Sequence, residues 1–75
     1  MQSLQPIKHS KRDLVLQTTS EQEADGQWSA SFAVFDDDRP RSLVYWMPSL
    51  FRTFRSEHEA DDAAMSAGLE FIEKL

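Results

Sequence analysis

The stretch from Ser56 to Leu75, SEHEADDAAMSAGLEFIEKL, decides the fold. Ser56 and Glu59 have the spacing of a capping box, in which the serine side chain accepts a hydrogen bond from the Glu59 amide and the glutamate reaches back to the serine amide. Acidic residues fill the opening turns, where they suit the positive end of the helix dipole. The segment therefore predicts an α-helix that begins near Ser56.

One side of this predicted helix is apolar and changes in size along its length. Its members follow the i, i+3, i+4, i+7 spacing of a helix face: Ala60, Ala63, Ala64, Ala67, Gly68, Phe71 and Leu75. The small residues of the first half allow a sheet to approach closely, and the bulky residues of the second half fill a wider gap. We expect this helix to lie across one face of a β-sheet.

The residues before the helix predict an antiparallel β-meander. The clearest strand runs over residues 27–35, where Trp28, Ala30, Phe32 and Val34 alternate with a second, more exposed set. Further strands are expected over residues 13–19, 42–47 and 50–55. The fold class is therefore α+β, with a three- to four-stranded antiparallel β-meander packed on one C-terminal helix in the order β-β-β-β-α. Residues 1–12 are mostly polar and are predicted to be a flexible N-terminal tail outside a single domain of residues 13–75.

The composition describes a small domain that has to be stabilised by packing or by association. The chain has 75 residues and no cysteine, so it has neither disulfides nor thiolate zinc ligands. A chain of this length buries only about 60% of the surface that its unfolded form exposes. Residues 1–6 contain no apolar run, and no segment reaches the roughly 20 apolar residues of a membrane span. We expect a cytoplasmic protein without signal peptide or membrane association.

The strands carry more large apolar residues than one helix can cover. Because side chains alternate between the two faces of a sheet, the second face is left with Phe35, Phe51 and either Tyr45 or the pair Val44 and Trp46. Three outcomes are open. The sheet curls so that both faces share one core, or the second face forms a homodimer interface, or it binds another partner.

A candidate interaction surface combines arginines with aromatic residues of the last two predicted strands: Arg39, Arg41, Tyr45, Trp46, Phe51, Arg52 and Arg55. Such combinations hold single-stranded nucleic acids by stacking and by neutralising phosphates. The net charge of −5 has the wrong sign for general nucleic-acid affinity. The plainer interpretation is that the arginines pair with neighbouring acids, each exposed pair contributing at most about 1 kcal/mol.

No catalytic, metal or cofactor motif is found in the sequence. Asp36-Asp37-Asp38 lacks the spaced oxygens and the glycine of a calcium loop, and His58 with Asp62 has no third ligand. Gly26 and Gly68 are the two glycines of the chain, so it has no glycine-rich phosphate loop. We therefore expect no cofactor and a non-enzymatic interaction or accessory module, with self-association as one outcome. Weak binding of single-stranded nucleic acid or an anionic ligand is the alternative.

The run Gly26-x-Trp28-x-Ala30, with Phe54 and the helix residues Glu59-Ala60, Ala64, Gly68 and Phe71-Ile72, resembles small uncharacterised bacterial domains. In those domains a β-meander that contains a tryptophan precedes an alanine-rich helix ending in an aromatic-Ile pair. The resemblance covers about residues 13–74. It implies the fold and no activity, so it assigns no functional residue.

Overall fold

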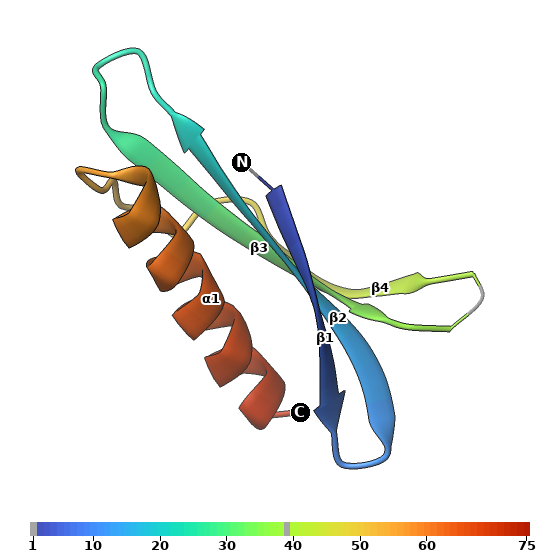
Figure 1. Cartoon of the computed structure of the whole chain (residues 1–75). Helices are drawn as coiled ribbons and strands as arrows, with labels where there is room; N and C mark the ends of the chain where they lie inside the picture. The colour runs from blue at the N-terminus through green and yellow to red at the C-terminus, as the bar shows by residue number, and fades with distance from the viewer. Residues whose placement is uncertain (1, 39) are drawn as a thin grey trace.

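A computed structural model describes every residue of the chain except Met1 and Arg39. Its elements are β1 (Gln2–His9), β2 (Arg12–Gln22), β3 (Trp28–Asp36), β4 (Ser42–Met47) and α1 (Glu57–Glu73). The four strands form one antiparallel sheet in the order β1-β2-β3-β4, and α1 packs on β2 and β3 (Figure 1). The predicted α+β architecture is confirmed. Within the described part of the chain, no helix is long and apolar enough to cross a membrane.

The start of α1 forms largely as the sequence predicts. Ser56 is the N-cap, and its Oγ accepts a hydrogen bond from the Glu59 amide at 3.1 Å. The Glu59 carboxylate reaches back one residue further than expected and accepts a hydrogen bond from the Arg55 amide at 3.3 Å. Two otherwise unpaired amides at the helix start are thereby satisfied.

The core lies between α1 and one face of the two central strands. The helix buries Ala60, Ala64, Gly68 and Ile72. The absence of a side chain at Gly68 is required, because an added Cβ would lie 2.4 Å from Cδ1 of Leu16, which is fully buried. The sheet contributes the set predicted to face the helix, all of it buried except the half-buried Trp28: Leu14, Leu16, Trp28, Ala30, Phe32, Val34 and Phe54.

The N-terminal residues belong to the sheet, and the prediction of an unpaired tail over residues 1–12 is wrong. Gln2–His9 pairs in continuous register with residues 12–19 of β2. A two-residue turn joins the strands, and Ser10 in this turn has a positive φ of 58°, as tight hairpins require. The strand was missed because it is polar and contains Pro6, which a sheet tolerates at an edge. Of its residues, Ile7 packs against the core.

The expected strand over residues 50–55 is also wrong, although this segment does run along β3. The Leu50 amide donates to the Ala30 carbonyl at 3.0 Å, and Phe54 exchanges two backbone hydrogen bonds of 2.8 Å with Trp28. Trp28 and Ala30 are two residues apart, whereas Leu50 and Phe54 are four apart. The extra residues therefore bulge away from β3, and Phe51 at the start of the bulge has a φ of 60°.

Candidate interaction surface

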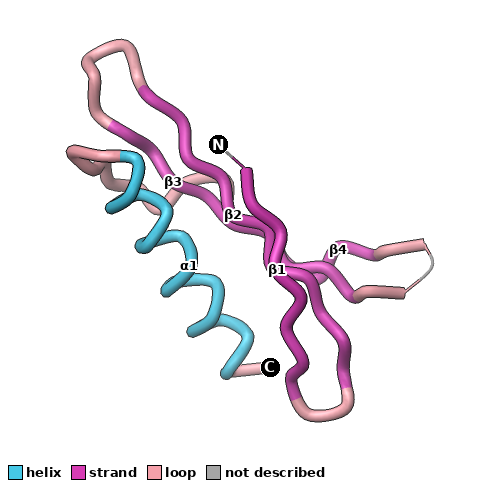
Figure 2. The backbone as a smooth tube through the Cα atoms, in the orientation of Figure 1, coloured by secondary structure: helices cyan, strands magenta, loops and turns pink. Residues whose placement is uncertain are grey.

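The face of the sheet opposite α1 carries two rows that cross all four strands and are apolar except for Gln17. The register aligns Pro6, Val15, Phe35 and Leu43 in one row, and Leu4, Gln17, Ala33 and Trp46 in the next. A β-bulge between Val34 and Phe35 shifts the pairing with β4, which brings Leu43 opposite Phe35. We call these eight residues the open face. In Figure 2, α1 runs along the other side of the sheet.

Side-chain exposure on the open face is low in its centre and high at its two edges. Val15 and Ala33 on the central strands are 4% and 6% exposed, because neighbouring side chains cover them. Leu4 on β1 is 56% exposed, and Leu43 and Trp46 on β4 are 56% and 60% exposed. Several large apolar side chains remain in water, which is the pattern of a contact surface.

Polar residues bound the open face at both ends, while its eight members carry no charge. Gln2, Thr19 and Ser31 form the next row on one side, and Lys8 opposite Asp13 lies on the other. An apolar centre with a polar rim is the usual anatomy of a protein–protein interface. The net charge of −5 therefore resides on other parts of the molecule.

The aromatic residues of the predicted interaction surface lie on different sides of the protein. The Tyr45 ring stacks on Phe71 of α1 with centroids 4.3 Å apart, so this side chain belongs to the covered side. Its neighbour Trp46 points to the open face. Phe51 lies in the bulge before α1 and is 87% exposed. Of the predicted set, the open face contains Trp46 alone.

The arginines of the predicted surface are similarly dispersed. Arg41 pairs with Asp37 at 3.0 Å, as the plainer interpretation expected. The Arg52 guanidinium lies over the Phe54 ring, 4.8 Å from its centroid. Arg55 is exposed next to the helix cap, and Arg39 lies outside the described residues. The described members of the set therefore do not form one stacking surface for bases.

Sequence reasoning placed Phe35 on the second face and left open whether Tyr45 or the pair Val44 and Trp46 joins it, and it missed most of the other members. Leu4 and Pro6 were assigned to the tail. Val15 and Ala33 were placed on the second side of their own strands, but they were not grouped with one another or with Leu43, because that grouping depends on the strand register. The turn at Ser10 and Lys11, which pairs residues 2–9 with β2, has none of the usual glycine or asparagine residues that could have revealed β1.

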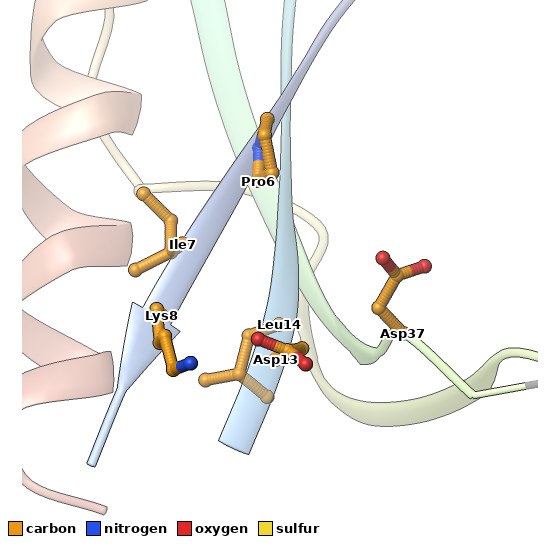
Figure 3. A pocket seen from close by; sticks show the side chains of 6 residues that line it. All are labelled: Pro6, Ile7, Lys8, Asp13, Leu14 and Asp37. Atoms are coloured by element: carbon orange, nitrogen blue, oxygen red, sulfur yellow. The ribbon is translucent and has the colours of Figure 1, made fainter. Parts of the chain in front are cut away.

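The described residues also line two hollows of similar size, of which the first borders the open face at Pro6. One, of about 220 Å³, is lined by Pro6, Ile7, Lys8, Asp13, Leu14 and Asp37. In Figure 3, Ile7 extends toward α1, and Asp37 lies beyond β2 at the end of β3. Its mixed lining includes two carboxylates, those of Asp13 and Asp37. These do not form a metal site, because among residues 2–38 and 40–75 no group of three His, Cys, Asp or Glu residues could hold a metal ion.

The second hollow, of about 210 Å³, lies between the last turns of α1 and β4. We call it the α1–β4 groove, and it is lined by Phe32, Tyr45, Met47, Ala67, Glu70, Phe71 and Lys74. Its walls are mainly aromatic and aliphatic. Glu70 and Lys74 form an exposed ion pair of 3.3 Å at its rim.

Comparisons with protein-family models, with curated proteins and with solved structures gave no match. The likeness to small bacterial domains therefore stays a prediction.

Proposed function

We propose that this protein is a small, cytoplasmic, non-enzymatic interaction module that self-associates by packing the open faces of two copies. The observation that supports the proposal is the pair of apolar rows across four strands, left uncovered by α1. Two sheets that pack face to face lie about 10 Å apart with interdigitating side chains. The exposed side chains at the edges of the open face and the sheltered residues at its centre suit such interdigitation.

The size of the open face favours a reversible dimer. Four strands about 4.8 Å apart and two residue rows about 6.8 Å apart give the open face a projected area on the order of 260 Å². Stable interfaces bury about 800 Å² per partner, and weaker ones bury less. We therefore expect an affinity in the micromolar to millimolar range, where association depends on concentration.

The distribution of charge favours a second copy over a charged partner. Two chains of net charge −5 repel each other, but the open face separates these charges because its eight residues are neutral. A nucleic acid or anionic ligand would find no cation among them. The alternative function, weak binding of single-stranded nucleic acid, has less support because the described arginines and aromatics of its predicted surface do not lie together.

The proposal is tested by replacing Trp46, the most exposed large apolar residue of the open face, with lysine. Sedimentation velocity over about 10 μM to about 1 mM covers the expected range of affinity. The average mass of the wild-type chain should rise with concentration. The Trp46→Lys chain should need at least about tenfold higher concentration for the same rise, since a buried charge without a partner opposes packing.

Leu69→Lys provides the matched control. Leu69 is an exposed apolar residue on α1, away from the open face, and its replacement changes the net charge by the same amount. This variant should associate as the wild type does. Identical mass profiles for the wild type and Trp46→Lys would contradict the proposal, as would a wild-type chain that stays monomeric at about 1 mM.

A further inference from the structure

Phe51 combines two properties that are rarely found together in an aromatic residue. Its side chain is 87% exposed, and its backbone has a φ of 60°, in the left-handed region that bulky residues avoid. The conformation is held in place, because the Phe51 amide donates a hydrogen bond of 3.0 Å to Ser49 Oγ. The bulge thus presents an apolar ring to the surroundings at a fixed position, which is the form of an anchor residue.

The α1–β4 groove has the size and the lining to receive such a ring. Its volume is about 210 Å³, and its walls include Tyr45, Met47 and Phe71. A protein cavity of about 150 Å³ holds a benzene molecule. The stacked rings of Tyr45 and Phe71 would give an entering phenyl group aromatic neighbours.

The Phe51 ring does not occupy the groove of its own chain, because its side chain is 87% exposed. Phe51 precedes the first turn of α1, whereas Ala67, Phe71 and Lys74 line the groove at the last turns. The 17 residues of α1 span about 25 Å. An occupant of the groove therefore comes from another chain.

We propose that Phe51 of one copy inserts into the α1–β4 groove of a second copy, and that Phe51 of the second copy inserts into the groove of the first. The two helices then run antiparallel about a two-fold axis near their middles. Such an isologous contact uses the same surface twice. The half-buried side chains of Ala63 and Ala67, on the flank of α1 between the two contact points, are small and allow close approach.

The charges next to the two contact points are complementary. The bulge carries Arg52 and Arg55 and has no acid between residues 48 and 56, whereas α1 carries six acids and no Lys or Arg over residues 57–73. At the groove rim itself, Lys74 follows the helix and pairs with Glu70 at 3.3 Å, so the attraction comes from the acidic helix as a whole. Insertion brings the bulge of one copy toward Glu70 at the rim of the other's groove. Opposite charges at the edge of an interface raise the association rate and select the partner.

This contact goes beyond the proposed function because it uses a different surface. The open face lies opposite α1, while Phe51 and the groove lie on the side of α1 and β4. Both contacts can form in one assembly, which then exceeds a dimer. The test therefore starts from the Trp46→Lys chain, in which the open face is disabled.

Two variants of the Trp46→Lys chain remove the two halves of the contact. Phe51→Gly removes the ring and also relieves the left-handed backbone, so folding is not endangered. Ala67→Trp fills the groove, and a thermal melt followed by circular dichroism verifies that it folds. Each variant should associate at least about tenfold more weakly than the Trp46→Lys parent in sedimentation equilibrium.

Mixing the two variants gives the decisive result. The groove-filled chain still has Phe51, and the Phe51→Gly chain still has an open groove, so one contact can form between unlike chains. An equimolar mixture should have a higher average mass than either variant alone. The inference is overturned if the mixture matches its components, if Phe51→Gly associates like its parent, or if the parent stays monomeric at about 1 mM.

The two proposals fail in different ways. If Trp46→Lys leaves wild-type association unchanged while Phe51→Gly removes it, the open-face proposal fails and the Phe51 contact stands. If Trp46→Lys removes all association, the Phe51 contact fails and the open-face proposal stands.

Discussion

The two faces of the sheet are built from the same strands, but α1 packs on only one of them. We call this one the covered face, and the other is the open face. On the covered face, Leu16 is fully buried and meets Gly68 of α1 so closely that no side chain would fit there. On the open face, the next residue, Val15, is 4% exposed only because Phe35 and its other neighbours in the sheet lie around it. The difference shows that low exposure alone does not identify the core. The covered face is closed by another element, and the open face is sheltered by its own edges.

The largest expected effect separates Leu16 from Val15. Leu16→Ala should lower the free energy of unfolding by about 2–5 kcal/mol, since it leaves a cavity under α1 that the close packing cannot fill. Val15→Ala should cost about 1–2 kcal/mol, because it removes two methyl groups from a face without a covering element. Chemical denaturation of both variants at low concentration measures the difference. Equal losses would mean that the two faces contribute alike to the monomer.

A smaller effect is expected where the helix touches the sheet. Gly68→Ala gains about 1 kcal/mol in helix propensity, but the new methyl group overlaps the side chain of the buried Leu16. Overpacking of this kind costs about 1–3 kcal/mol, so we expect a net destabilisation of roughly 1 kcal/mol in thermal or chemical unfolding. Ser66→Ala, at an exposed position two residues earlier on α1, is the control and should be neutral or slightly stabilising. A stabilised Gly68→Ala would show that α1 moves freely on the covered face.

The smallest expected effect lies outside both faces, at Phe51. A left-handed conformation costs an ordinary residue about 1–2 kcal/mol, and glycine adopts it freely but loses about 0.5–1 kcal/mol of chain entropy. Phe51→Gly should therefore stabilise the protein by about 0.5–1 kcal/mol in chemical denaturation. Phe51→Ala keeps the strain and should be close to neutral, because the ring it removes is 87% exposed. A destabilised Phe51→Gly would indicate that the ring packs on its own chain.

Much of the covered face could be predicted from the sequence because its signals are local. The Ser56 cap, the alanine-rich stripe of α1 and the alternation from Trp28 to Val34 each lie within one element. The prediction of β1 failed because its pairing depends on a turn at Ser10 and Lys11 that has none of the usual glycine or asparagine residues. A polar edge strand also has little apolar alternation to reveal it.

The open face was predicted only in part, since it is a property of the register. Phe35 could be placed on a second face by alternation alone, whereas alternation left open whether Tyr45 or Trp46 joins it. To group these residues with Leu4 and Pro6, one must know that β1 pairs with β2. To place Leu43 beside them, one must know of the bulge between Val34 and Phe35. The location of Phe51 was missed for a related reason: the sequence of residues 50–55 suits a strand, but the spacing of its two anchor points on β3 does not.

Pro6 in the edge strand β1 has a consequence for how copies of this chain can meet. An edge that offers an unbroken series of amide donors can template the addition of further strands, which leads to fibrous aggregates. The proline ring interrupts that series in the middle of β1, and the adjacent Lys8 adds a charge that opposes stacking of like edges. Growth by strand addition at the β1 edge is thereby discouraged, which favours encounters between copies through their side-chain surfaces.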